Sequence, residues 1–142
     1  MNSAGGAAAS NEKSVRGISL DMRIGIDIVE TGRIAQAIER TGDAFVARLI
    51  SAEEMHGLDQ PTNVERVAGI WAAKEAAVKA LGTGFRNGIT FHDIQILHDE
   101  LGKPYFAFSG EFEKVMRAEN LQTSLLTISH CRTHAVAAAV LD

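Results

Sequence analysis

Two acidic residues lie where the surrounding sequence calls for apolar side chains. Asp27 is in the middle of the apolar stretch GIDIV, and Glu75 falls within the helical stretch 64–81. Laid out at about 100° per residue from Val64, Glu75 lies at about 20°, inside the apolar arc, and Lys79 lies at about 60°, at its edge. An unpaired carboxylate on an apolar contact surface is costly. Each acid therefore predicts a partner: a cation, a metal ion or hydrogen-bond donors.

Two alternatives remain open for these acids. Glu75 and Lys79 could form a surface i,i+4 pair worth about 0.3–0.5 kcal/mol. Asp27 could be satisfied by backbone amides at a strand end. Taken together, however, two carboxylates in otherwise apolar elements favour a shared divalent cation. Because both ligands are hard oxygen donors, Mg²⁺ or Ca²⁺ is favoured over zinc.

The stretch GTG at residues 82–84 offers backbone N–H groups without side-chain obstruction, a geometry suited to phosphate. It follows a helix C-terminus, where the dipole repels anions, so a glycine C-cap followed by a loop is the alternative. GTGFRNG also lacks the G-x-x-x-x-G-K-[ST] pattern of a Walker A loop. The sequence thus argues against an ordinary nucleotide hydrolase.

The segment HCRTH invites two further hypotheses. His130, Cys131 and His134 could belong to a zinc site, but a fourth ligand is not apparent and a hairpin explains the segment. Ser129 beside His130 could suggest a nucleophile and base, but adjacent strand residues point to opposite faces and no G-x-S-x-G elbow is present. His130 remains either a ligand-binding donor or a histidine with an ordinary structural partner.

Three arginines form a candidate docking surface. Arg33 and Arg40 are seven residues apart, on nearly the same face of a predicted helix, and Arg48 is available on the next helix. The alternatives are a solvated helix face and a small basic surface for an acidic partner.

Composition limits the classes of protein that fit. A chain of 142 residues with 46% hydrophobic residues predicts one domain with a real core. A net charge of -4 and the lack of a basic run argue against nucleic acid as a partner. No apolar run approaches the ~20 residues of a membrane span, and one cysteine suits a reducing compartment, so we expect a cytoplasmic protein without a membrane partner. Residues 1–21 suggest a flexible extension or an expression remnant, and residues 22–142 a single domain.

The predicted elements give an α+β fold, a mostly antiparallel sheet packed on a long central helix and shorter helices. Thr31 is the predicted cap of a helix that ends near Arg40, and Asp43 is the predicted cap of a second helix. A Ser51–Glu54 capping box begins a short helix that ends at Gly57, and a Thr62–Glu65 capping box begins a long one that ends at Gly82. A last predicted helix spans 110–120. Predicted strands are 22–30, 93–97 and 105–108, the last two joined by a turn in which Pro104 begins the next strand, and a final hairpin of 124–130 with 134–142.

The motifs in their order resemble the bacterial holo-acyl-carrier-protein synthases, the small single-domain 4'-phosphopantetheinyl transferases. The stretch GIDIVE contains the family's G-x-D motif, and WAAKEAAVKALGTG contains its W/F-x-x-K-E-[AS]-x-x-K-A motif. The stretches DELGKPY and TISH follow at the expected places. The resemblance runs from about Met22 to Asp142. It implies transfer of the phosphopantetheine arm of coenzyme A to a serine of apo acyl carrier protein, releasing adenosine 3',5'-bisphosphate, as fatty acid biosynthesis requires.

Roles follow from the resemblance at the matching positions. Asp27 and Glu75 would bind Mg²⁺ together with the pyrophosphate of coenzyme A, Lys79 would contact the phosphates, and Glu75 is the best candidate for the base. The coenzyme A contacts would be completed by Gly82, Thr83, Gly84, Lys103, Pro104 and His130. Arg33, Arg40 and Arg48 would meet the acidic helix of acyl carrier protein. The family also implies a homotrimer with active sites at subunit interfaces.

Three positions depart from the family pattern. Ile70 stands where many members have an arginine that contacts the 3'-phosphate, Leu125 where a histidine is frequent, and His134 where an aromatic residue is frequent. Two other functions use the same residues: a Mg²⁺-dependent phosphohydrolase acting on coenzyme A-like pyrophosphates, and a non-catalytic trimeric binding module.

Overall fold

Two antiparallel sheets and one long helix form the framework of the computed structural model, which describes residues 21–58 and 63–142. A three-stranded sheet has the order β1-β5-β4, and a two-stranded sheet pairs β2 with β3. The strands are β1 (Arg23–Glu30), β2 (Ile94–His98), β3 (Pro104–Phe108), β4 (Ser124–His130) and β5 (His134–Leu141). The predicted hairpin of 124–130 with 134–142 is confirmed, as is a strand that begins at Pro104.

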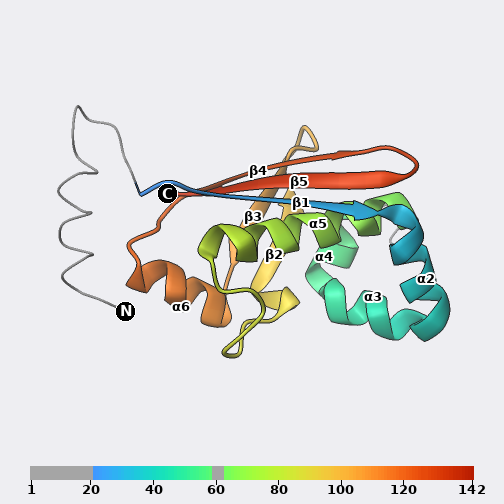
Figure 1. The fold of residues 1–142 in the computed structure, drawn as a ribbon, viewed down its shortest axis with the longest axis horizontal. Helices are drawn as coiled ribbons and strands as arrows, with labels where there is room; N and C mark the ends of the chain where they lie inside the picture. The colour runs from blue at the N-terminus through green and yellow to red at the C-terminus, as the bar shows by residue number, and fades with distance from the viewer. Residues whose placement is uncertain (1–20, 59–62) are drawn as a thin grey trace.

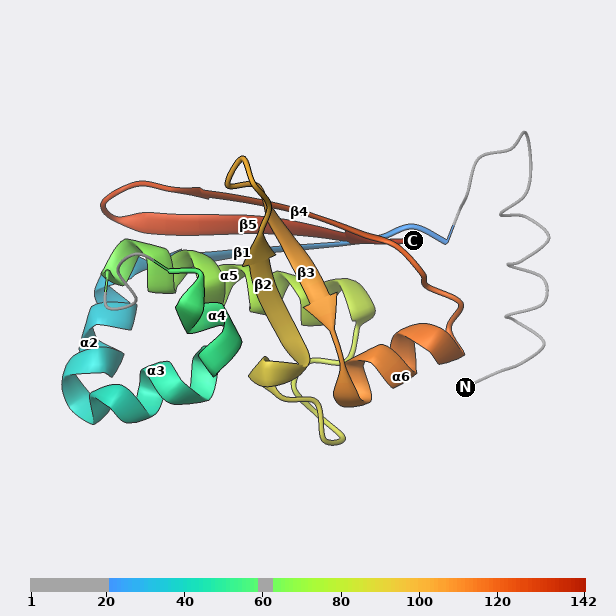
Figure 2. The ribbon, with the colours of Figure 1, turned by 180° about the vertical axis from the view of Figure 1, so that it is seen from behind.

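The helices lie on one side of the three-stranded sheet, with α5 directly against it (Figure 1). Seen from behind, the β2–β3 pair crosses α5 at an angle, between the α3–α4 end and α6 (Figure 2). The helical elements are α2 (Thr31–Thr41), α3 (Asp43–Leu49), α4 (Ala52–His56), α5 (Val64–Leu81), the 3₁₀ turn η2 (Phe91–Asp93) and α6 (Gly110–Ala118). The α+β prediction is confirmed. No helix in 21–58 or 63–142 combines the length and apolarity needed to cross a membrane.

Two predicted helix caps are wrong. Thr31 is the first residue of α2 and does not cap it; its hydroxyl donates to the carbonyl of Arg132 at 2.6 Å. Asp43 is likewise inside the first turn of α3, which begins after Gly42. A distant contact with the Arg132 carbonyl occupies the Thr31 hydroxyl, whereas the positive φ of the adjacent Gly42 sets the start of α3.

Other predicted helix ends are confirmed. Ser51 and Glu54 form the reciprocal capping box of α4, and Gly82 ends α5 in the left-handed conformation with φ 86°. The predicted cap Thr62 lies outside the described residues. The observed N-cap of α5 is Asn63, whose side chain accepts from the backbone N–H of Arg66 at 3.2 Å.

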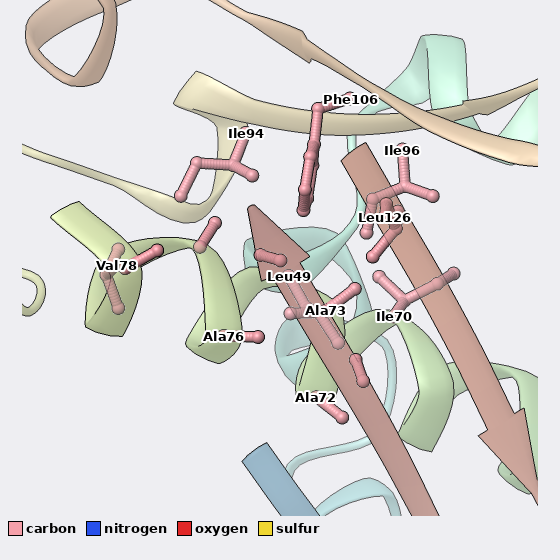
Figure 3. Packing of buried hydrophobic residues seen from close by; sticks show 14 of the residues in the cluster. Leu49, Ile70, Ala72, Ala73, Ala76, Val78, Ile94, Ile96, Phe106 and Leu126 are labelled. Atoms are coloured by element: carbon pink, nitrogen blue, oxygen red, sulfur yellow. The ribbon is translucent and has the colours of Figure 1, made fainter. Parts of the chain in front are cut away.

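The core is built where α5 meets both sheets. Small side chains of the helix, Ala72, Ala73 and Ala76, lie among larger ones from the strands, such as Phe106 and Leu126 (Figure 3). Alanines let the backbones approach closely, so most of the circumference of α5 is buried. A helix buried nearly all round has no solvated face to reveal its orientation in the sequence.

The alternation predicted for residues 22–30 is confirmed, and the structure adds its direction. Ile24, Ile26 and Ile28 point away from α5 and are 67%, 62% and 66% exposed. The register places Ile26 beside Ala138 of β5, which in turn pairs with Thr127 of β4. In the part of the chain that the structure describes, no helix covers this outer face of the sheet (Figure 1).

Candidate active site

Asp27 and Glu75 come together in one groove of about 600 Å³. The groove lies between β1, α2, α3 and α5, and its apolar walls include Ile34, Phe45 and Trp71. Two acids that lie 48 positions apart in the sequence thus face the same space, which also has an apolar side. Such a combination of apolar walls and a few convergent charges is typical of a ligand site.

Gly25 explains how Asp27 reaches this position. The alternation of β1 turns Gly25 and Asp27 toward α5, and at Gly25 the strand touches the helix backbone. A Cβ at residue 25 would lie 2.0 Å from the carbonyl oxygen of Ala76 and 2.5 Å from the backbone nitrogen of Ala80. Only glycine permits this approach, which carries the Asp27 carboxylate to the C-terminal half of α5, near Glu75 and Lys79.

Lys79 completes the charged cluster, but its partner is Asp27. Its ammonium lies 2.9 Å from Oδ1 of Asp27 and donates to the carbonyl of Ile26 at 3.2 Å. The Lys79 side chain is 54% exposed, whereas that of Asp27 is 13% exposed. The Lys79 ammonium therefore pairs with Asp27 and does not form the simple surface pair with Glu75.

In the charged cluster, the half-buried Glu75 carboxyl is the acid whose ionised form is disfavoured by its surroundings. Burial raises the pKa of Glu75, the Asp27 carboxylate raises it further, and the Lys79 ammonium acts in the opposite direction. Two carboxylates that repel each other in a partly buried groove are relieved by a cation between them. This donor set fits a hard divalent ion.

The number of protein ligands also fits magnesium better than a closed metal site. Residues 21–58 and 63–142 contain no cluster of three His, Cys, Asp or Glu side chains able to hold a metal ion. Mg²⁺ commonly takes one or two carboxylates and completes its shell with water and substrate phosphate oxygens. The same finding leaves the HCRTH segment without a zinc site among the described residues. Within this segment Cys131 contacts Thr133 at 3.4 Å.

The residues implied for the coenzyme A nucleotide lie apart from the two acids within one chain. Pro104 and His130 line a second groove of about 530 Å³, together with Arg66 and His98. His130 Nδ1 is 3.2 Å from a carboxylate oxygen of Glu65. One chain thus presents the acids in one groove and these nucleotide-end candidates in another.

The remaining nucleotide candidates occupy turns. Gly82 and Gly84 both have positive φ angles, and the Thr83 hydroxyl donates to the carbonyl of Gly84 at 2.9 Å. Lys103 is held in its turn by a backbone bond to the Asp99 carboxylate, which leaves its side chain exposed.

The three arginines all lie on the α2–α3 side of the molecule. Arg33 lines the groove of the two acids. Arg40 is exposed in the last turn of α2, and the guanidinium of Arg48 lies over the ring of Phe91 at 5.9 Å from its centroid. Their positions are compatible with one basic surface beside the groove.

Sequence reasoning missed the ion pair of Lys74 with Glu54. Both side chains are buried, with Nζ and Oε1 2.8 Å apart. Burial lowers the pKa of Lys74, and Glu54 opposes that shift. The one signal in the sequence is that Lys74 falls within the alanine-rich part of the helix, where a charged side chain requires a partner.

Comparison with known proteins gives a consistent result. The model of the 4'-phosphopantetheinyl transferase superfamily matches residues 23–139. Holo-[acyl-carrier-protein] synthases of Koribacter versatilis and Solidesulfovibrio magneticus are 42% and 45% identical over 119 and 121 residues, covering 83% and 84% of this chain and 95% and 96% of theirs.

Solved structures agree in fold. The synthase of Neisseria meningitidis superposes with a TM-score of 0.77 at 35% identity, over 84% of this chain and 97% of that one. The Helicobacter pylori synthase, solved in complex with coenzyme A, superposes with a TM-score of 0.75 at 32% identity, over 84% of this chain and 99% of that one. Residues 23–139, which the superfamily model matches, include β1, α5 and all the residues that line the groove between them. The chain therefore belongs to the 4'-phosphopantetheinyl transferase superfamily.

Proposed function

We propose that this chain transfers 4'-phosphopantetheine from coenzyme A to a serine of apo acyl carrier protein, as a holo-[acyl-carrier-protein] synthase. The observation that carries the proposal is the meeting of Asp27, Glu75 and Lys79 at one groove. The relatives' names and the coenzyme A complex of a similar protein support it. Two acids and one exposed ammonium are the groups that a pyrophosphate substrate needs.

The reaction joins the serine oxygen to the phosphorus that carries pantetheine and breaks its bond to adenosine 3',5'-bisphosphate. Asp27 and Glu75 would hold Mg²⁺, which supplies charge neutralisation at the pyrophosphate when bound. The half-exposed Lys79 ammonium would contact the leaving phosphate. The serine proton passes to Glu75, directly or through water. Burial and Asp27 raise the pKa of Glu75 in the metal-free chain, and a bound cation would act in the opposite direction.

We infer a homotrimer with shared active sites. The outer face of β1-β5-β4 exposes Ile24, Ile26 and Ile28, and Leu125 of β4, 63% exposed, lies on the same face across Val140 of β5. A contiguous apolar face of this kind is typical of a protein interface. Assembly over this face would bring the groove of one chain, with Pro104 and His130, toward the acids of a neighbour.

The arginines suit the carrier protein as partner. Arg33 lines the groove, while Arg40 and Arg48 extend the positive surface along α2 and α3. An acidic carrier helix would meet these charges as its serine enters the groove. The exposed free thiol of Cys131 agrees with a cytoplasmic location, where thiols stay reduced.

A mass assay tests the proposal. The protein is incubated with coenzyme A, Mg²⁺ and apo acyl carrier protein, and the mass of the carrier protein is measured by mass spectrometry. A mass gain of one phosphopantetheine is expected, and Asp27→Ala and Glu75→Gln should abolish it while leaving the fold intact. Cleavage of coenzyme A without a gain would indicate the phosphohydrolase, and no reaction the binding module. Near-normal transfer by either variant would refute the metal assignment.

A further inference from the structure

Lys74 is a charged residue that the proposed reaction does not use. It is among the largest fully buried side chains in the described part of the molecule. Its ammonium donates to three acceptors: the carbonyl of Leu49 at 2.5 Å, Oε1 of Glu54 at 2.8 Å and the carbonyl of Phe91 at 3.0 Å. All three protons of the ammonium therefore have a partner.

Glu54 extends the network to other elements. Its Oε1 also accepts from the backbone N–H of Ser51 at 2.9 Å, and its Oε2 accepts from that of Ile96 at 2.9 Å. The pair thus connects α5 with the end of α3, with α4, with η2 and with β2. No buried side-chain nitrogen or oxygen in the described residues lacks a partner, so the network is complete.

The elements that Lys74 ties together carry the wall of the groove. Trp71, one helical turn before Lys74, stacks on Phe45 of α3 with 5.9 Å between ring centroids, and it packs at a tilt of 38° against Phe91 of η2 with 5.3 Å between centroids. The same ammonium that holds the carbonyl of Phe91 thus fixes one of the rings on Trp71. Phe45, Trp71, Phe91 and Leu49, together with Arg48, also enclose a small cavity of about 100 Å³ next to the groove.

The energetics favour a geometric role over a purely stabilising one. A buried ion pair must recover the hydration of both ions, and an apolar pair of similar volume is commonly as stable. What an apolar pair lacks is direction, since an ammonium with three acceptors fixes its neighbours at defined distances and angles. Here those neighbours set where the aromatic wall stands relative to Glu75, the next residue of the same helix.

We propose that Lys74 and Glu54 are positioning residues that hold the Phe45–Trp71–Phe91 wall and the end of α3 beside the acids. This inference rests on the proposed function and adds to it that the pair controls affinity for the carrier protein. Arg48 and Phe45 lie on α3, on the docking side. The phosphate-facing group Lys79 lies more than a turn further along α5 and is joined to β1, outside this network.

The test uses the double variant Lys74→Met with Glu54→Gln, which avoids leaving one buried charge unpaired. Trp71 is the only tryptophan in the chain, so its quenching by acrylamide reports directly on the wall. We expect quenching to rise about twofold, KM for the carrier protein to rise about tenfold, and KM for coenzyme A to stay within about twofold. Met116→Ala, in the buried face of α6, is the matched control for lost stability.

Several results would overturn the inference: unchanged quenching and KM in the folded double variant, equal increases of both KM values, or the same carrier-specific change in Met116→Ala. If the double variant does not fold, a second neutral pair, Lys74→Gln with Glu54→Gln, is measured against the same criteria. Absence of transfer by the unmodified protein would instead refute the proposed function, and with it the effect on the carrier protein. The quenching comparison needs no activity and still decides whether the pair restrains the wall.

Discussion

Replacing Gly25 by alanine tests whether close approach of β1 to α5 builds the site. The new methyl would lie 2.0 Å from the Ala76 carbonyl oxygen, and ordinary contact begins at 3.4 Å. Strand or helix must therefore move by about 1.4 Å. The opposing atoms are backbone atoms of a helix packed on both sides, so no flexible side chain can absorb the shift. Overpacking of this kind costs about 3 kcal/mol at the upper end of its usual range.

This cost corresponds to a fall in the unfolding temperature of about 6–12 °C for a chain of this size. Catalysis should suffer more than the fold, because Asp27 follows two residues later on the same strand. A displacement of about 1 Å in a positioned group can reduce a rate about a hundredfold. Thermal unfolding and the carrier-protein mass assay measure the two effects, with both proteins at the same concentration.

Gly32→Ala is the matched control for this substitution. Gly32 lies in the first turn of α2, and a Cβ there would meet nothing within 4 Å. Alanine should keep activity and raise stability by about 0.5–1 kcal/mol, since it is the better helix former. Wild-type stability and activity in Gly25→Ala would refute the argument that the contact at residue 25 positions Asp27.

Three further predictions concern charge, assembly and docking. Because burial and Asp27 raise the pKa of Glu75, its ionised form opposes folding, and stability is lost as pH rises through the raised value. Without divalent cations, Glu75→Gln should therefore unfold at a higher temperature than wild type at pH 8 and lose this advantage below about pH 4.5; an equal or lower value at pH 8 would contradict the assignment. Ile26→Glu should convert trimers to smaller species in sedimentation velocity and reduce transfer, whereas Leu101→Glu, at a 95% exposed position, should do neither; an unchanged assembly would exclude this face. Charge reversal at Arg33 or Arg40 should raise KM for the carrier protein far more than for coenzyme A, and equal effects would count against docking there.

The elements that could be predicted are those whose signal is local. The period of residues 22–30 gave β1, and the run from Val64 to Gly82 gave α5, because alternation and a glycine stop are local properties. The cap at Thr31 could not be predicted from neighbours, because its hydroxyl is committed to the Arg132 carbonyl 101 positions away. A turn formed by the last two strands overrides the local preference of threonine to precede a helix.

The site was partly predictable for the same reason. Asp27 and Glu75 stood out because each acid interrupts an apolar pattern, and the structure places them in one groove. Lys74 did not stand out, because a lysine beside a glutamate reads as part of a charged face. Glu54 was explained by its capping box, which uses one oxygen; the contact of the other with Ile96, 42 positions away, was invisible in the sequence.

The two lysines of α5 show how burial separates roles that their sequence motif leaves equivalent. Lys74 and Lys79 flank the acid Glu75, and either could be imagined on a phosphate. The Lys74 ammonium has three acceptors and no exposure, so reaching a substrate would require giving up bonds inside the core. The Lys79 ammonium makes two hydrogen bonds in the described structure, and its side chain is half exposed, so one N–H can turn toward a phosphate without breaking either. The geometry therefore favours the proposal that Lys79 contacts the substrate, and it leaves Lys74 to the framework.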